Sequence, residues 1–135
     1  EYGSLLKKFK AQDLAPEDRL KRLLEAIWSR EYYEKINVAG SFAVLAVSFR
    51  NEKIHDKIRD LYRMFKIFLV REFSYLNDQG VISTKNPTHT AEIIMTMIEG
   101  SRHFRAFIIE DDQIRRYNQD MIGAARHFLQ SHMAM

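Results

Sequence analysis

Histidine and acidic side chains are the residues of this sequence most able to hold a metal ion, and their spacing argues against such a site. No two of the five histidines are four residues apart, the spacing that puts two ligands on one face of a helix. One Glu-x-x-His pair, Glu52 and His55, has the spacing used in di-iron helix bundles, but those sites need two such pairs and two further glutamates. We therefore expect Glu52 and His55 to lie exposed in the first turn of a helix, with no metal ion and no cofactor in this protein.

The residue patterns of nucleophilic and phosphate-transfer enzymes are also missing from the sequence. There is no cysteine, no Gly-x-Ser-x-Gly elbow and no glycine-rich phosphate loop. Serine, histidine and acidic residues are present, but no spacing groups them. The absence of cysteine excludes disulfides and thiolate metal sites, and it fits a reducing cytoplasm. We expect a cytoplasmic protein that is not an enzyme.

Aromatic and methionine side chains are more informative about function. The sequence has 9 phenylalanines, 6 tyrosines, 1 tryptophan and 6 methionines. Most are expected to fill the core, but together they can also line an adaptable apolar cavity with a few polar groups. Glu99 and His103, one turn apart, would supply those polar groups. Such a lining accepts a small apolar or cationic effector. The candidate pocket residues are Trp28, Phe42, Phe65, Phe68, Met95, Glu99 and His103.

Length and charge indicate one globular domain, and nothing in the distribution of charge makes it a DNA-binding module. With 135 residues, 46% of them hydrophobic, the sequence can bury one core. Its formal net charge is +3, and the basic residues near the amino end are interleaved with Glu17, Asp18 and Glu25 rather than gathered in one stripe. The best candidate for a membrane span, Phe42 to Phe49, is far shorter than the roughly 20 residues required. We expect no membrane contact.

The small number of glycines and prolines and the helical spacing of apolar residues predict an all-α bundle of about six helices. Residues 4–12 are expected to be the end of a helix whose start is missing. Asp13 and Pro16 open the next helix. A third helix, over about 36–49, is apolar nearly all round and is expected at the centre of the fold. The apolar stripe of the second helix is Leu20, Leu23, Leu24, Ile27 and Trp28.

Capping residues mark the remaining helices. Asn51 is the predicted N-cap of a long fourth helix, which ends at Gly80 because glycine readily takes the left-handed conformation. The fifth helix is expected to begin at Thr88 or Thr90. The acidic pair Asp111–Asp112 favours the start of the sixth. The side chains of the fourth helix expected to point inward are Ile54, Ile58, Leu61, Phe65, Phe68 and Leu76.

Three stretches, taken in order, carry a resemblance to a known family. They are APEDRLKRLLEAIW, the segment from AGSFAVLAVSFRNEKIH to SYLNDQGVIS, and NPTHTAEIIMTMIEG, where an alanine near a helix start precedes an acid–glycine pair. From about Ala15 to Phe128, the sequence resembles the carboxy-terminal ligand-binding and dimerisation domain of the tetracycline-repressor (TetR) family of bacterial transcriptional regulators. The resemblance implies that residues 13–135 form that domain. It also implies that residues 1–12 end the helix leading from an amino-terminal helix-turn-helix domain that this chain lacks.

The resemblance implies a homodimer. In the family, the last two helices form a four-helix bundle with the same helices of a second subunit, and here both have a second apolar face that a monomer's core would not need. Gly100 would let two helices approach closely, and Glu99 would point toward the pocket or pair with Arg102 or Arg105. The expected interface residues are Ile93, Met97, Gly100, Phe104, Phe107, Ile114, Tyr117, Met121, Ala124 and Phe128.

The function implied by the resemblance is effector sensing within a transcriptional regulator. Its partners would be a second copy of the chain, a small effector, and operator DNA through the missing amino-terminal domain only. The alternative is a helical protein-interaction or scaffold domain without a small-molecule pocket. A cavity of a few hundred cubic ångströms would favour the first function over the second.

Overall fold

The described part of the chain is built from helices, as a computed structural model of residues 14–29 and 38–131 shows; residues 38–42 are described by their backbone alone. No strand occurs within these ranges, so the all-α prediction is confirmed. The first expected helix, over residues 4–12, lies outside the described residues. The helices are α2 (Pro16–Ile27), α4 (Val38–Ser48), α5 (Glu52–Asp78), α6 (Pro87–Ile108) and α7 (Ile114–Gln130), with a 3-10 turn, η1 (Asp111–Gln113), before α7.

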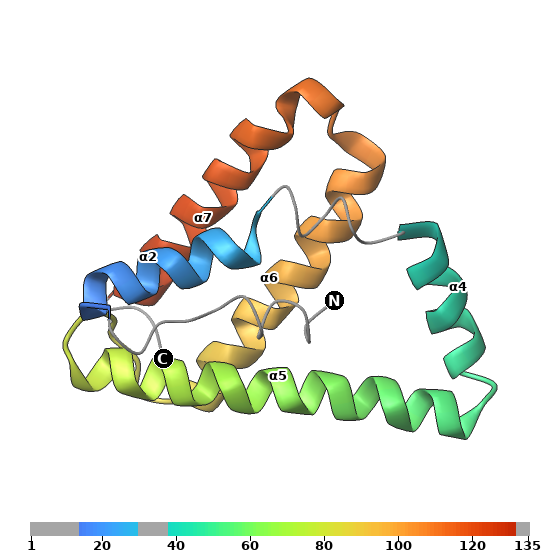
Figure 1. The fold of residues 1–135 in the computed structure, drawn as a ribbon, viewed down its shortest axis with the longest axis horizontal. Coiled ribbons are helices and arrows are strands. Elements are labelled where there is room, and N and C mark those ends of the chain that lie inside the picture. The colour runs from blue at the N-terminus through green and yellow to red at the C-terminus, as the bar shows by residue number, and fades with distance from the viewer. Residues whose placement is uncertain (1–13, 30–37, 132–135) are drawn as a thin grey trace.

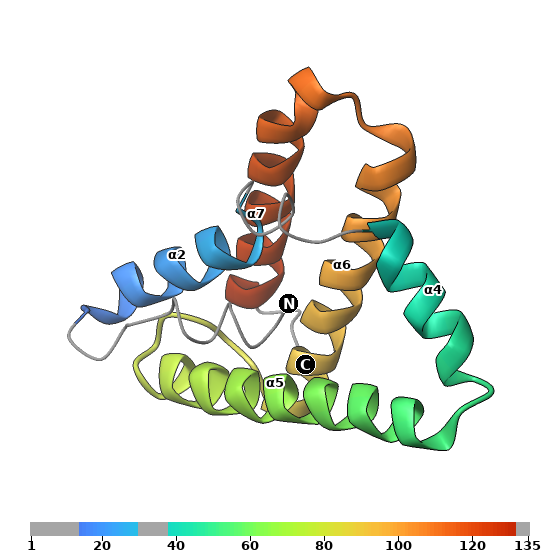
Figure 2. The ribbon, with the colours of Figure 1, turned by 45° about the vertical axis from the view of Figure 1, so that its right-hand side comes forward.

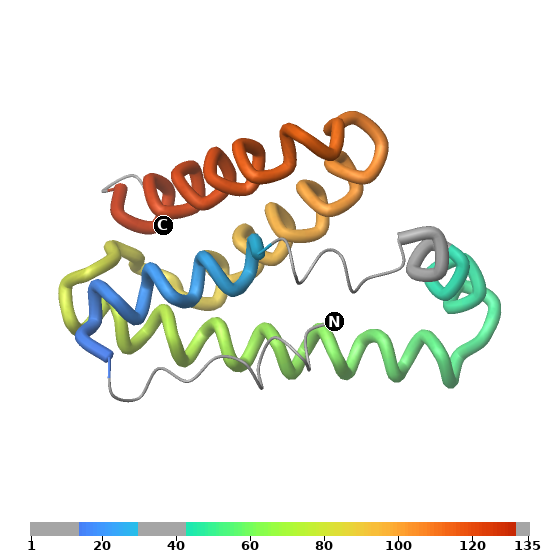
Figure 3. Tube along the Cα trace, turned by 45° about the horizontal axis from the view of Figure 1, so that its top comes forward, coloured from blue at the N-terminus to red at the C-terminus, as the bar shows by residue number. Residues whose placement is uncertain are grey.

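The long helix α5 forms one side of the molecule, and the other helices are arranged along it (Figure 1). Helices α6 and α7 form an antiparallel hairpin that projects away from α5, with η1 at its tip (Figures 1 and 3). Helix α2 lies beside α7, over the carboxy-terminal half of α5, whereas α4 stands at the opposite end of α5 (Figures 1 and 2). Among the described residues, most of the buried ones therefore lie toward the end of α5 that α2 and α7 share.

The core lies where α2, the second half of α5, and the α6–α7 hairpin meet. The predicted stripe of α2 is confirmed, because each of its five residues is at most 2% exposed. Trp28, at the end of this stripe, donates a hydrogen bond from Nε1 to Ser101 Oγ of α6 at 2.9 Å, which satisfies both buried polar groups. The other buried hydrophobic residues are Phe65, Leu69, Phe73, Leu76, Val81, Ile82, Ala91, Ile94, Ile98, Ile122, Ala125 and Leu129.

An ion pair joins α2 to α5 at the edge of this core. Arg19 donates from Nε to Glu72 Oε1 at 2.8 Å and from Nη2 to Glu72 Oε2 at 2.7 Å. The guanidinium carbon also lies 4.2 Å from the centre of the Tyr75 ring. The hydrogen bonds to Glu72 raise the pKa of Arg19. This bidentate contact fixes the position of α2 on α5.

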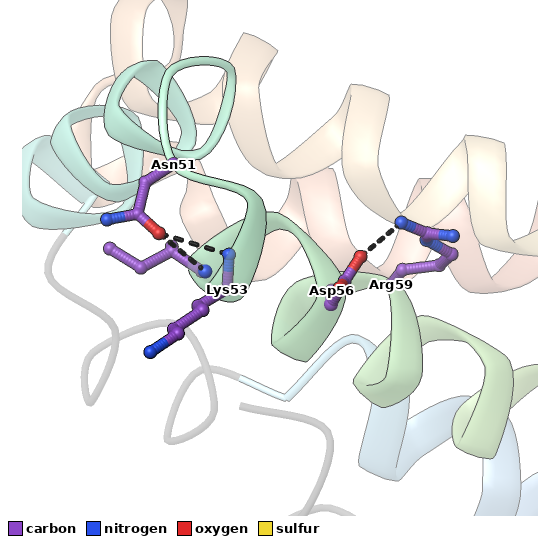
Figure 4. A network of polar contacts seen from close by, with 5 residues as sticks. Asn51, Lys53, Asp56 and Arg59 are labelled. Atoms are coloured by element: carbon purple, nitrogen blue, oxygen red, sulfur yellow. Dashed lines mark hydrogen bonds and ion pairs between the residues drawn. The ribbon is translucent and has the colours of Figure 1, made fainter.

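The predicted ends of α5 are confirmed. Asn51 accepts hydrogen bonds at Oδ1 from the backbone N–H groups of Lys53 and Ile54, as an N-cap should (Figure 4). After α5, Gly80 has a φ of +75°, in the left-handed region.

The predicted start of α6 was wrong. Its N-cap is Asn86, which accepts the N–H of His89, and Pro87 occupies the first turn, where its missing N–H costs nothing. Thr90 is instead fully buried within the helix, 2.6 Å from the hydroxyl of Thr84.

The expectation that the third helix is central was also wrong. Helix α4 lies at the other end of the described residues from α2 and packs on the first half of α5 (Figure 2). Val44 and Val47 are 50% and 47% exposed, and Phe49, just after the helix, is 81% exposed. Leu61 of α5, expected to point inward, is 39% exposed because it lies on the half of α5 beyond the core. The apolar character of α4 predicted burial, but the pattern could not show whether another element covers it.

Candidate functional site

An open groove lies at the end of the molecule where α4, the first half of α5 and α6 converge. Its volume is about 540 Å³, within the range of sites for small molecules. Helix α5 supplies half of the lining from a single face, at the spacings of three and four residues that bring side chains together on a helix. The lining residues are Leu45, Ser48, Phe49, His55, Ile58, Arg59, Tyr62, Arg63, Lys66, Glu92, Met95 and Thr96.

Positive charge is concentrated on the α5 wall of this groove. Arg59 pairs with Asp56 one turn earlier on the same helix (Figure 4). Lys66 pairs across the groove with Glu92 of α6, and this hydrogen bond lowers the pKa of the Glu92 carboxyl. Arg63, between them, has no ion pair with any residue that the structure describes. The groove therefore holds two compensated cations and one uncompensated cation.

A second polar bridge joins α5 to α6 beside the groove. Tyr62 donates a hydrogen bond from its hydroxyl to Glu99 Oε1 at 2.9 Å. The same carboxylate lies 3.7 Å from Arg102 Nη1, so the predicted pairing of Glu99 with Arg102 is confirmed. Burial and the neighbouring Glu99 carboxylate raise the pKa of Tyr62 to about 12. At neutral pH Tyr62 is therefore protonated and able to donate.

The ten predicted interface residues, which we call the α6–α7 outer face, recur at spacings of three and four residues along α6 and α7. None of the ten is buried within its own chain. Phe104 and Phe107 are 51% and 73% exposed, and the Phe104 ring stacks on Tyr117 at 6.1 Å between centroids. At Gly100, an added Cβ would meet nothing within 4 Å. Within the described residues the outer face is partly covered, since Met97, Met121 and Phe128 also pack against the core.

Sequence comparison shows the family to which the chain belongs. A family model described as "Tetracyclin repressor-like, C-terminal domain" matches residues 15–129. The chain belongs to this family. No curated protein and no solved structure is significantly similar to it. The TetR-like carboxy-terminal domains are regulatory domains of transcription regulators, which fits the absence of an enzyme motif from the sequence.

The pocket residues predicted for this TetR-like domain fall in several places. Met95 lines the groove, and Glu99 accepts the hydrogen bond from the groove residue Tyr62. Trp28 and Phe65 are instead enclosed in the core. His103 and Phe68 are half-buried, and Phe68 stacks on Phe65 at 6.2 Å. The side chain of Phe42 lies outside the described residues. The assignment of these seven residues to a ligand site stays a prediction.

Sequence reasoning missed the charged wall of the groove. The signal was present, since Arg59, Arg63 and Lys66 follow one another at spacings of four and three residues. That spacing also aligns them with Ile58 and Tyr62, so one face of α5 mixes cations with apolar groups. From the sequence alone, this face of α5 resembles an ordinary solvated helix face. It becomes the wall of a groove only because α4 and α6 lie beside it.

The described residues contain neither a metal site nor a membrane-spanning helix. Within 14–29 and 38–131, no three histidine, aspartate or glutamate side chains are arranged to hold a metal ion. Glu52 and His55 are both exposed in the first turn of α5, as predicted. No helix in these ranges is both long and apolar enough to span a bilayer.

Replacing Tyr62 with phenylalanine is expected to lower the free energy of unfolding by about 1.5 kcal/mol at neutral pH, the range for a hydrogen bond to a charged acceptor. Folding raises the pKa of Tyr62 from 10.0 to about 12. The protonated Tyr62 hydroxyl therefore contributes its full stabilisation below pH 10, and this contribution is lost as the pH rises toward 12. Urea unfolding of both proteins along this pH range measures the difference. If the loss of unfolding free energy caused by Tyr62→Phe stayed constant up to pH 12, the hydrogen bond from Tyr62 to Glu99 would not be its cause.

Proposed function

We propose that this chain is the effector-sensing and dimerisation domain of a transcriptional regulator. It pairs with a second copy through the α6–α7 outer face and binds a small molecule in the groove between α4, α5 and α6. Membership of the family supports the regulatory role. The observation that carries the proposal is the outer face, where Phe104 and Phe107 are more than half exposed and none of the ten residues is buried.

The outer face has the properties of an interface between identical subunits. Its aromatic side chains form an exposed patch toward the tip of the hairpin, where Ile108 is also 60% exposed. Soluble monomers rarely expose contiguous apolar patches of large extent. Gly100 of this face is exposed on α6, and a Cβ added there would meet nothing within 4 Å. Such a position permits close approach of a helix from outside the chain. A two-fold axis would place the same patch of both copies together.

The groove supports small-molecule sensing over the scaffold alternative. A domain that only bound other proteins would not need a concave site of about 540 Å³ with apolar and charged walls. In the proposed function, the effector enters beside the exposed Phe49.

Helix α6 connects the two proposed sites. Glu92, Met95 and Thr96 line the groove, whereas Ile93 and Met97 belong to the outer face. A ligand that displaces the groove side of α6 would therefore also change how its other side meets the second subunit. Such coupling requires that the ligand bind one arrangement of α6 more tightly than the other. A cytoplasmic location, the domain boundary at residue 13 and contact with operator DNA through a helix-turn-helix domain stay predictions that accompany this function.

Sedimentation equilibrium of the 135-residue chain tests the proposal. We expect a species of twice the 16.0 kDa of one chain at micromolar concentration. A monomer at that concentration would rule out the α6–α7 outer face as a dimer interface, and with it the proposed function. Addition of a ligand found by thermal-shift screening should alter the dimer dissociation constant, because the two sites share α6.

A further inference from the structure

We propose that the groove selects an amphipathic anion, namely an acyl or aryl chain that ends in a carboxylate, and that Arg63 binds the carboxylate. This inference rests on the proposed effector-sensing function and specifies its ligand class. It departs from the apolar or cationic effector that the aromatic and methionine content suggested. The reason is the arrangement of charge in the groove, which composition alone does not reveal.

The lining of the groove carries a net positive charge. Arg59, Arg63 and Lys66 contribute +3 and Glu92 contributes −1, so the formal charge of the lining is +2 with His55 neutral. Asp56 and Glu92 compensate Arg59 and Lys66, so the charge without a partner on the α5 wall is that of Arg63. A cationic ligand would be repelled by Arg63, whereas an anion meets complementary charge there.

Arg63 is the cation best placed to hold a carboxylate. Its two cationic neighbours along the groove already have acidic partners, Asp56 for Arg59 and Glu92 for Lys66. Among the described residues none forms an ion pair with Arg63. A guanidinium presents its N–H donors in a planar fork that matches the two oxygens of a carboxylate. A ligand carboxylate at Arg63 would satisfy this fork without breaking an existing pair.

The remaining lining fits the tail of an amphiphile. Leu45 of α4, Phe49 after it, Ile58 of α5 and Met95 of α6 bring apolar surface from three elements to the same groove. Met95 also packs against the core, so the groove leads from the charged wall toward buried apolar groups. A ligand with a charged head and an apolar tail can contact both parts together, whereas a small anion such as acetate contacts only one.

Isothermal titration calorimetry of the full 135-residue chain with three ligands of equal chain length tests this inference. The ligands are decanoate, decanol and decyltrimethylammonium, with the two ionic ligands kept below their critical micelle concentrations and decanol below its solubility limit. We expect decanoate to bind at least about tenfold more tightly than either of the others, a difference of about 1.4 kcal/mol. Acetate should not bind measurably, because it lacks the tail.

The variant Arg63→Gln identifies the carboxylate contact. It should weaken decanoate binding by about tenfold and leave decanol binding unchanged, because glutamine retains much of the side chain but not the charge. Arg71→Gln is the matched control, since Arg71 is an exposed arginine of the same helix that does not line the groove. It should leave both affinities unchanged, and Ile58→Ser should weaken decanoate and decanol alike.

Several outcomes would overturn the inference, and they differ from a failure of the proposed function. Equal affinity for decanoate and decanol, tighter binding of decyltrimethylammonium, or undiminished decanoate binding by Arg63→Gln would each exclude an anion-selective groove while leaving effector sensing in place. Binding of none of the amphiphiles by a dimeric protein would exclude this ligand class. Co-sedimentation with phosphatidylglycerol vesicles, without binding of monomeric decanoate, would assign the groove to a lipid surface instead. A monomeric protein that binds none of them would count against the proposed function itself.

Discussion

Replacing Phe107 with glutamate is expected to raise the dimer dissociation constant about a hundredfold or more, which corresponds to about 2.7 kcal/mol. Phe107 is 73% exposed in its own chain and lies on the α6–α7 outer face, so the proposed dimer would bury its ring. A carboxylate at that position would have to lose its hydration without a partner, and two copies would bring two such charges toward the same interface. Sedimentation equilibrium measures the constant, and circular dichroism should show unchanged helix content.

Phe49→Glu is the matched control for this substitution. Phe49 is even more exposed, at 81%, and is equally apolar, but it lies at the opposite end of the molecule, after α4. Its replacement should leave the dimer dissociation constant unchanged, although it alters the groove. If the Phe49 and Phe107 substitutions weakened the dimer equally, general apolar association would explain the result, and the outer face would lose its specific role.

Local sequence signals predicted most of the helices because the physics of a helix end is local. Asn51 and Gly80 mark the two ends of α5 through interactions with their immediate neighbours, and both predictions are confirmed. The start of α6 was misplaced at Thr88 or Thr90 because Asn86, two residues before Thr88, was not recognised as the N-cap. Asn86 prevails because the proline that follows it fits only the first turn of a helix.

The candidate site was harder to predict because it depends on which elements lie side by side. Trp28 and Phe65 were suitable pocket residues by type, but their helices meet toward the end of α5 that α2 and α7 share, where both rings are enclosed. The groove formed at the other end, where α4 leaves part of α5 open. The sequence places Arg59, Arg63 and Lys66 on one face of α5 and Arg71 off it, but it does not show that this face becomes the wall of a groove. That property comes from the position of α4 and α6.

The ion pair between Arg19 and Glu72 also depends on tertiary contact, since 53 residues separate the two side chains in the sequence. The side chains of Arg19 and Glu72 are only 18% and 8% exposed. Removing one partner would leave the other charge largely buried and without compensation, which costs more than the intact pair contributes. We therefore expect Arg19→Met or Glu72→Met alone to lower the free energy of unfolding by about 3 kcal/mol.

The double variant, with methionine at both positions, should be more stable than either single variant, because it leaves no unpaired charge in the contact between α2 and α5. Urea unfolding at one fixed protein concentration measures all four proteins, since the stability of a dimer depends on concentration. Arg116→Met provides the control: Arg116 pairs with Asp120 at 2.7 Å, but both side chains are more than half exposed, so its loss should cost no more than about 0.5 kcal/mol. Additive effects of the two single substitutions would mean that Arg19 and Glu72 do not act as a pair, and that apolar contacts alone hold α2 on α5.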